Sequence, residues 1–425
     1  MTHLLTRLAA ATALFALPAT ASAQAMDPVA LRDAALTDDL AYEITEGLTT
    51  EVGPRLAGTE AEARARAWAL KTLTALGFKN VRNEPFEMKT WVRGVETLEV
   101  LAPFPQPLHL TALGNSGATS AKGLEADIVY FPDLAALNAA PDGSLRGKIA
   151  FVSHGMTRTQ DGSQYGAFGA ARRSGPTVAA RKGAAAILIR SIGTDYHRNP
   201  HTGVTNFAEG VAPIPAAALS LPDAEQLERI LKRGQPVKVK LTLTPRQIGT
   251  TESGNVIAEV PGSDPAAGMV VVACHLDSWD LGTGAFDDAT GCGIVAAAAK
   301  RIMDAGTPRR TIRILWAGAE EVGVFGGKAY FDSHKSENHA LAAESDFGAD
   351  RRERAGGGAD VAALIAAGVA GIDLQQDGSR YFDLHHTPDD TLDKVDPAQL
   401  RQNVAAWTAM LAVVANAPEE IGPVK

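Results

Sequence analysis

The chain has 425 residues, of which 45% are hydrophobic and 21% are charged, and its formal net charge at pH 7 is −9. This length is sufficient for two domains with sizeable hydrophobic cores. The excess of acidic residues argues against a nucleic acid or an anionic membrane as the partner, because both would repel the chain.

Residues 1–25 have the pattern of a targeting segment. Arg7 gives a positive start, Leu8–Leu17 an apolar stretch and Ala21–Ala23 a small-residue cleavage site, although cleavage after Ala25 fits equally well. The apolar stretch is too short for a retained membrane helix, and no later segment reaches the roughly 18 consecutive apolar residues that such a helix needs. We therefore expect a cleaved signal peptide and a secreted or periplasmic protein. An uncleaved anchor is the less favoured alternative.

The next part of the chain is predicted to be helical and then extended. Its clearest helix is Thr59–Leu76, which is amphipathic and is followed by Gly77, a residue that commonly ends helices. Residues Phe78–Val100 partly alternate between apolar and polar positions, as strands do.

Between residues 107 and 245 the pattern changes to short apolar runs separated by Gly, Ser and Asn. These runs predict strands at Ile128–Phe131, Lys148–Val152, Ala185–Arg190 and Val237–Leu243. We expect a β-rich domain at 107–245, inserted between the two parts (26–106 and 246–425) of a larger domain. No cluster of potential metal ligands is apparent in this insert, and we expect three scattered histidines in it to be surface or rim residues: His154, His197 and His201.

The stretch Val270–Gly293 carries the strongest functional pattern. Val270–Ala273 predicts a buried strand and Ala289–Met303 a helix. The loop between them carries His275, Asp277, Asp280, Asp287 and Asp288. Carboxylates this close repel one another unless a cation holds them, so a divalent metal ion is the simplest explanation. Either Asp287 or Asp288 taken alone would be explained by a position near a helix N-terminus.

The spacing within this loop adds a second indication. His275 and Asp277 are two residues apart, so on an extended chain their side chains share a face. This arrangement is typical of a metal-bound imidazole that a carboxylate orients.

Two further predicted strands end in acidic residues. Ile312–Trp316 is followed by Glu320 and Glu321, one of which can bind a metal while the other faces a bound water. Ala342–Asp346 predicts a strand for which Asp346 is the candidate ligand, with Glu344 and Asp350 as competitors. Active sites of open α/β sheets lie at such strand ends.

A histidine candidate lies near the end of the chain. His386 precedes a Thr-Pro-Asp turn that would fix its imidazole, and His385 is the competitor. Pro397–Ala415 predicts a closing amphipathic helix.

The only two cysteines, Cys274 and Cys292, flank the acidic loop. Export permits a disulfide, but two cysteines do not make a disulfide framework. We expect them to be two small buried apolar side chains.

Residues 275–291, HLDSWDLGTGAFDDATG, resemble the signature of the di-zinc exopeptidases, the clan of zinc aminopeptidases and glutamate carboxypeptidases. Ser278–Trp279 is most similar to the carboxypeptidase Q-like branch. Arg146–Val152 together with Ala179–Ile187 is similar to the protease-associated domain, a β-rich insert of that branch. The resemblance covers nearly the whole mature chain. It implies an α/β fold with a mixed, mostly parallel central sheet flanked by helices, and a protease-associated insert.

The resemblance also implies a role for each site residue. Two zinc ions per chain would be bound, with these ligands and partners: His275 and Asp346 for one zinc, Glu321 and His386 for the other, Asp287 between the two, Glu320 as general base, and Asp277 orienting His275. Such a set of carboxylates and imidazoles needs divalent ions to coexist in one cleft. A hydroxide held between paired metals would attack the peptide carbonyl. Cobalt or manganese are alternatives to zinc.

One part of the chain departs from the family pattern. After Asp346, only a short basic link, Arg351–Arg354, precedes Gly357–Asp360, where the family has a helix and a strand. The predicted ligands lie on both sides of this gap, so the metal site can still form. The sequence does not predict the form of the sheet edge, the substrate pocket or the dimer face.

The expected function is therefore that of a zinc exopeptidase acting on dipeptides or short peptides, in the carboxypeptidase or dipeptidase mode. An aminopeptidase of the same fold is the first alternative. The second is a non-catalytic binding protein, if the shortened segment disables the pocket. We expect no nucleic-acid partner and no membrane attachment after signal cleavage, and a homodimer is left open.

Overall fold

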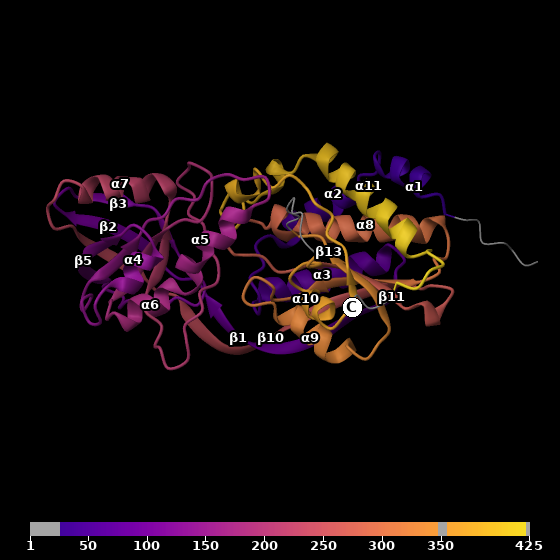
Figure 1. Cartoon of the computed structure of the whole chain (residues 1–425), viewed down its shortest axis with the longest axis horizontal. Helices are drawn as coiled ribbons and strands as arrows, with labels where there is room; N and C mark the ends of the chain where they lie inside the picture. Colours follow the sequence, from indigo (N-terminus) through magenta and orange to yellow (C-terminus); the bar gives the residue numbers. More distant parts are fainter. Residues whose placement is uncertain (1–25, 347–354, 422–425) are drawn as a thin grey trace, which may run out of the picture.

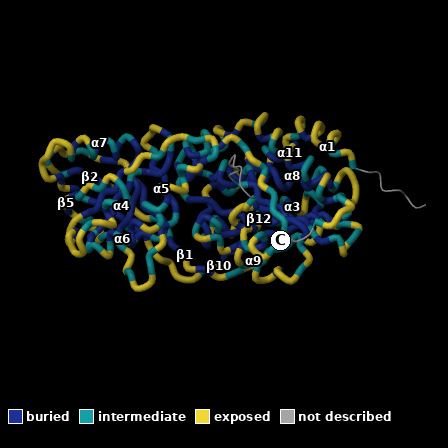
Figure 2. Tube along the Cα trace, viewed as in Figure 1, coloured by how far each residue is buried: buried dark blue, intermediate teal, exposed yellow. Residues whose placement is uncertain are grey.

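The computed structural model describes residues 26–346 and 355–421. The molecule has two lobes side by side (Figure 1), and each lobe has its own buried interior (Figure 2). The predicted signal peptide and the basic link 351–354 lie outside the described residues. Within the described ranges, no helix has both the length and the apolar character needed to cross a bilayer.

A six-stranded mixed sheet forms the centre of the larger lobe. Its strands, in spatial order, are β1 (Lys79–Val92), β10 (Arg246–Val260), β12 (Thr311–Ala317), β11 (Met269–His275), β13 (His339–Glu344) and β14 (Ala370–Gly371). The last four run parallel to one another, whereas β10 is antiparallel to both β1 and β12. The expected mixed α/β fold is confirmed.

Helices cover both faces of this sheet because alternate strand residues point to opposite sides. On β11, Val270 and Val272 pack into one core cluster, while Val271 and Ala273 pack into another. The first face is covered by α1 (Pro28–Ala35), α2 (Leu40–Gly47), α3 (Glu60–Ala75), α8 (Thr290–Ala305) and α11 (Pro397–Val414). The second face is covered by α9 (Phe325–His334) and α10 (Ala362–Ala366).

The smaller lobe, which we call the insert lobe, is built on an eight-stranded sheet. In spatial order its strands are β3 (Gln106–Leu108), β2 (Glu96–Ala102), β9 (Lys238–Leu243), β5 (Leu124–Phe131), β6 (Ile149–Val152), β7 (Ala186–Arg190), β8 (Ala216–Leu219) and β4 (Leu110–Ala112). Its helices are α4 (Leu134–Ala139), α5 (Ser163–Arg173), α6 (Gly175–Arg181) and α7 (Leu221–Leu231). The sheet takes in β2, which precedes the predicted boundary at residue 107. That boundary and the protease-associated type of the insert stay predictions.

Short helical turns complete the secondary structure of the described residues. They are η1 (Leu48–Val52), η2 (Pro265–Ala267), η3 (Ala285–Ala289), η4 (Tyr381–Asp383) and η5 (Leu392–Lys394).

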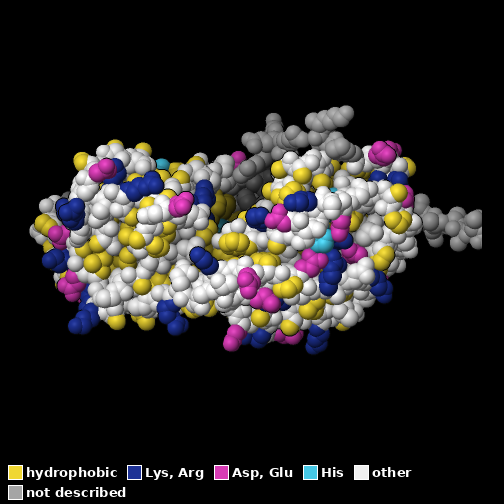
Figure 3. Space-filling model, turned by 90° about the horizontal axis from the view of Figure 1, so that it is seen from below, with side chains coloured by type: hydrophobic (Ala, Val, Ile, Leu, Met, Phe, Trp, Pro, Cys, Tyr) yellow, Lys and Arg dark blue, Asp and Glu magenta, His cyan; other side chains and the backbone are white. Residues whose placement is uncertain are grey.

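The two lobes are joined by the long antiparallel pair β1 and β10, which pairs from Lys79–Glu259 to Val92–Arg246 (Figure 1). The loop after β11 also contacts the insert lobe. Gly114 lies so close to the Trp279 ring that a Cβ there would come within 2.2 Å of it. The lobes therefore pack directly against each other beside the functional loop. On the face shown in Figure 3, basic and acidic side chains are interspersed rather than gathered into patches of one sign.

The expectation for the cysteines is wrong. Cys274 and Cys292 form a disulfide. Cys274 lies near the end of β11 and Cys292 in the first turn of α8, and the intervening loop returns the chain to its starting point. Sequence spacing alone does not reveal this closure.

We expect the double substitution Cys274→Ala/Cys292→Ala to lower the free energy of unfolding by about 3 kcal/mol, because a cross-link closing a loop of this length restricts the unfolded chain. Urea-induced unfolding of the variant and of the wild-type protein measures the difference. The wild-type protein unfolded in a reducing agent is the control and should lose similar stability. Equal stability of variant and oxidised wild type would contradict the prediction.

Candidate metal centre and active site

The carboxyl ends of the parallel strands bring the predicted residues to one edge of the sheet. His275 is the last residue of β11 and pairs in register with Ala317, the last residue of β12. Glu320 and Glu321 follow β12, and Asp346 follows β13. Segments far apart in the sequence therefore meet where open α/β sheets place their active sites.

Asp287 lies at the centre of this group. Its Oδ1 is 2.8 Å from His275 Nε2, and its Oδ2 is 3.2 Å from His386 Nε2. His386 Nε2 is in turn 2.8 Å from Glu321 Oε2. One carboxylate thus contacts both predicted imidazole ligands, each through a different oxygen.

The donor atoms of this group fit a metal ion. Potential ligand atoms of His275, Asp287 and Glu321 all lie within 4.8 Å of one another, and all three side chains are buried. Zinc takes nitrogen and oxygen ligands at 2.0–2.2 Å, which places neighbouring ligand atoms of a tetrahedral site about 3.3 Å apart. The separations in this group, from 2.8 Å between His275 and Asp287 to at most 4.8 Å, bracket that value.

Asp346 stands slightly apart from this compact group. Its Oδ1 accepts a hydrogen bond from the Tyr381 hydroxyl at 3.2 Å. Its charge still helps to raise the pKa of His275, after the larger effects of Asp287 and Asp288. Asp346 is therefore close to the centre, and its role as a ligand stays a prediction.

Asp277 connects the two sides of the site. His275 Nδ1 lies 3.0 Å from the backbone oxygen of Asp277 and 3.9 Å from its carboxylate, so the backbone makes the closer contact. The Asp277 carboxylate accepts a hydrogen bond from the Glu320 backbone N–H at 3.0 Å. Asp277 thereby fixes the imidazole and the start of the glutamate pair together.

The pKa shifts of the site residues follow from many buried carboxylates lying close together, an arrangement that favours positive charge. Burial lowers the pKa of His275, but the hydrogen bond and charge of Asp287 outweigh it and raise that pKa well above its usual value. For His386, likewise, Glu321 and Asp287 outweigh burial and raise the pKa. Burial raises the pKa of Glu320 well above its usual range, and the neighbouring Glu321 adds to this. Without a metal ion, protons bound to these side chains compensate the negative charge of the carboxylates. Divalent cations would take the place of those protons.

Two further buried acids lie beside Glu320. Glu344 Oε2 accepts the backbone N–H of Asp360 at 2.9 Å, and Asp360 Oδ1 accepts that of Gly327 at 3.0 Å. Burial, with a contribution from Asp346, raises the pKa of Glu344 to about 8. The competitor Glu344 thus supports, through Asp360, the first turn of α9, the helix that follows the glutamate pair. The other competitor, Asp350, lies outside the described residues.

Two supporting residues were not predicted from the sequence. Arg55 is completely buried and donates hydrogen bonds to the backbone oxygens of Leu276, Thr283 and Gly284. Asp390 accepts the backbone N–H groups of Phe286 and Asp287 at 2.6 and 3.2 Å. Asp390 could have been suspected from its place after His386, but a single arginine in a turn gives no such signal.

The expectation for His201 is wrong, whereas His154 and His197 are exposed as expected. His201 is buried in the site, where its ring stacks on His386 with centroids 5.0 Å apart. Its Nε2 lies 3.2 Å from Nδ1 of His385, whose Nε2 lies 3.2 Å from Asp287. The backbone around His201 folds over the loop that carries His386, a long-range contact that no local pattern indicates.

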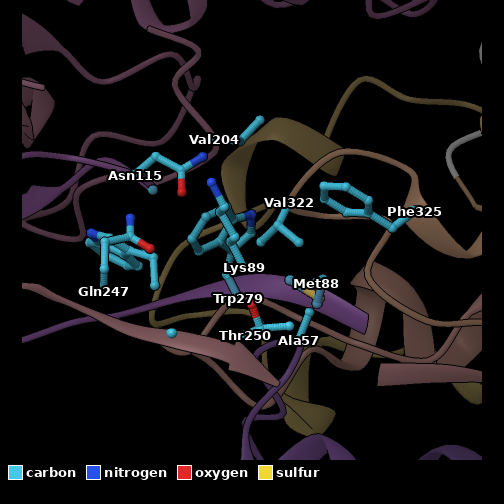
Figure 4. A pocket seen from close by; sticks show the side chains of 13 residues that line it. Ala57, Met88, Lys89, Asn115, Val204, Gln247, Thr250, Trp279, Val322 and Phe325 are labelled. Atoms are coloured by element: carbon cyan, nitrogen blue, oxygen red, sulfur yellow. The ribbon is translucent and has the colours of Figure 1, made fainter. Parts of the chain in front are cut away.

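A cavity of about 530 Å³ opens beside the centre, between the lobes (Figure 4). Met88, Val322 and Phe325 line it from the larger lobe, and Asn115 and Val204 line it from the insert lobe. Trp279 also lines the cavity, and its ring centroid is 5.9 Å from that of His386.

The wall of this cavity also offers polar groups to a ligand. Lys89 lines it, is exposed, and takes part in no ion pair among the described residues. The buried indole nitrogen of Trp279 has no hydrogen-bond partner in the described part of the chain. The cavity is therefore largely apolar with a cation at its wall.

Comparisons with known proteins agree with this site. The profile of Peptidase family M28 matches residues 255–355. Carboxypeptidase Q of Bos taurus is 33% identical over 412 residues, covering 89% of this chain and 86% of that protein, and the Homo sapiens protein is 32% identical with the same coverage. The crystal structure of a peptidase M28 precursor from Shewanella amazonensis SB2B superposes with a TM-score of 0.91 at 46% identity, covering 94% of this chain and 98% of the other.

An aminopeptidase from Aneurinibacillus sp. strain AM-1 has the same fold, with a TM-score of 0.62, 20% identity, and coverage of 94% and 99%. The fold and the site together define a metallo-exopeptidase. The chain belongs to peptidase family M28, as the resemblance in its sequence predicted.

Proposed function

We propose that this protein is a secreted or periplasmic exopeptidase that binds two zinc ions and hydrolyses dipeptides or short peptides in the carboxypeptidase or dipeptidase mode. The observation that carries the proposal is the position of Asp287, whose two oxygens contact His275 and His386 separately. The carboxypeptidase Q relatives support the choice of mode.

The proposed ligands divide into two sets. His275 and Asp346 would hold one ion, Glu321 and His386 would hold the other, and Asp287 would contribute to both. Two zinc ions in these positions would polarise the peptide carbonyl and lower the pKa of the attacking water toward neutrality.

Glu320 is the proposed general base. It lies next to the proposed ligand Glu321, and its backbone N–H donates a hydrogen bond to the Asp277 carboxylate, which holds the backbone of the glutamate pair beside His275. Its carboxylate takes a proton from the attacking water and returns it to the leaving amine.

The cavity beside Trp279 suits the C-terminal residue of a substrate. An apolar side chain would pack against Met88, Val322 and Phe325, while the free carboxylate would pair with Lys89. A cation in this position favours substrates that end in a free carboxylate over those that only have a free amine.

Lys89→Met is expected to raise KM for unmodified dipeptides about tenfold with little change in kcat, because a charge-assisted contact to bound substrate is lost. Steady-state kinetics measure this effect. Lys79→Met, at the other end of β1, is the matched control and should leave KM unchanged. An unchanged KM for Lys89→Met would remove Lys89 from the substrate site.

The proposed function is tested with three groups of compounds: free dipeptides, N-acylated dipeptides, and aminoacyl chromogens, each with and without a chelator. Cleavage of N-acylated dipeptides supports the carboxypeptidase mode. Cleavage of free dipeptides alone supports a dipeptidase, and cleavage of the chromogens supports the aminopeptidase alternative. Zinc binding without cleavage of any compound would favour the non-catalytic alternative.

A further inference from the structure

We infer that the insert lobe, through His201 and Thr202, holds the ligand His386 in place, so that one of the two metal sites depends on both lobes. This inference rests on the proposed function, because it concerns the ligand set proposed there. Thr202 and His201 lie in the insert lobe, far in the sequence from the loop that carries His386.

Thr202 and His386 make a reciprocal pair of contacts. The Thr202 backbone N–H donates to the His386 backbone oxygen at 3.0 Å, and the Thr202 backbone oxygen lies 3.3 Å from His386 Nδ1. A carbonyl oxygen can only accept a hydrogen bond, so Nδ1 carries the hydrogen. The lone pair is then on Nε2, the atom that faces Asp287 and Glu321. Thr202 thereby selects the form of the imidazole that can bind a metal.

The backbone at His386 needs this support. Its φ angle is 60°, in the left-handed region that residues other than glycine rarely adopt. Such a conformation persists only where surrounding contacts determine it. The contacts with Thr202 constrain both the backbone and the ring of His386.

Thr202 is itself firmly held within the insert lobe and at its border. It is completely buried, its hydroxyl donates to the Ala112 backbone oxygen at 2.9 Å, and it accepts a hydrogen bond from Arg93 Nη2 at 3.2 Å. The neighbouring His201 adds a second support, since its ring stacks on the His386 ring with an interplanar angle of 20°.

In the part of the chain that the structure describes, His275, the imidazole of the other proposed metal site, is held from its own loop rather than from the insert lobe. His275 Nδ1 is held by the Asp277 backbone oxygen, two residues away on the same loop. Disturbing the contacts from the insert lobe should therefore lower the affinity for one zinc ion and leave the affinity for the other unchanged.

The test is Thr202→Val, which keeps the shape of the side chain but removes the hydroxyl contacts to Ala112 and Arg93, and so leaves Thr202 less firmly held against His386. Zinc bound per chain is measured on the full-length protein across a series of buffered free zinc concentrations. We expect the wild-type protein to bind two ions. In Thr202→Val the dissociation constant of one ion should rise about tenfold, the order found when partners of metal ligands are removed, while the other stays unchanged.

The matched control is Thr205→Val in the same segment. Thr205 is also completely buried, but its hydroxyl donates to the Arg172 backbone oxygen at 2.7 Å, and among the described residues it makes no hydrogen bond to a proposed metal ligand. Its zinc binding should equal that of the wild-type protein. His201→Ala is a second, independent variant. It removes the stacked ring and should lower the affinity for the same zinc ion as Thr202→Val does.

Wild-type binding of both ions in Thr202→Val and His201→Ala would overturn the inference and leave the proposed function standing. Equal weakening of both ions, or the same loss in Thr205→Val, would also overturn it. Failure of the wild-type protein to bind two ions would instead count against the proposed function.

Discussion

Glu320→Gln is expected to lower kcat by about 10³-fold while the protein still binds two zinc ions per chain. The amide keeps the size of the side chain and its place beside Asp277, but it cannot accept a proton from the attacking water. Because Glu320 is not a proposed ligand, the metal content should not change. Elemental analysis and steady-state kinetics on the same preparation measure the two quantities together.

The adjacent residue provides the control for this substitution. Glu321→Gln makes the same chemical change, but Glu321 Oε2 lies 2.8 Å from His386 Nε2 within the proposed ligand set. We expect this variant to lose zinc as well as activity. If Glu320→Gln lost zinc and Glu321→Gln kept it, the two roles would have to be exchanged.

The sequence was most informative where local patterns and strand ends coincide. The buried strands β11 and β12 and the helices α3, α8 and α11 lie close to their predicted ranges. The strand ends predict His275 and the two glutamates after β12 as candidates, and the turn after residue 386 predicts one of two adjacent histidines. The resemblance to the di-zinc exopeptidases then assigns Glu321 and His386 as ligands. The structure brings His275, Glu321 and His386 around Asp287.

Contacts between distant segments could not be predicted in this way. Arg55 supports the metal loop through backbone oxygens that any sequence provides, so its partners leave no pattern. His201 reaches the site from the other lobe and depends on how the lobes pack. The Cys274–Cys292 disulfide depends on the path of the loop between them, although its cysteines were correctly placed beside that loop.

The position of β2 illustrates the same limit at the level of lobes. It follows β1 after a short turn along the chain, yet it pairs with β9, which lies more than a hundred residues later. That pairing decides which sheet β2 belongs to. The change in residue pattern along the chain, in contrast, predicts a boundary at residue 107.

Asp287→Asn is expected to have the largest effect on metal binding, with loss of both zinc ions and of nearly all activity. An asparagine offers one oxygen and one NH₂ donor, so it cannot serve two cations as the two carboxylate oxygens can. Removing partners of metal ligands already costs about 10–100-fold in affinity, so loss of a shared ligand should exceed that for each ion. Titration with buffered zinc, followed by activity measurement, tests this.

Asp389→Asn is the matched control for the charge change. Asp389 lies three residues after His386, and its carboxylate accepts a hydrogen bond from Asn199 at 2.7 Å. Removing this charge should leave both zinc ions bound. If Asp287→Asn retained one ion at wild-type affinity, Asp287 would belong to a single metal site. The two imidazoles would then need separate carboxylates, and Asp346, which stands beside the centre, would have to serve the His275 side alone.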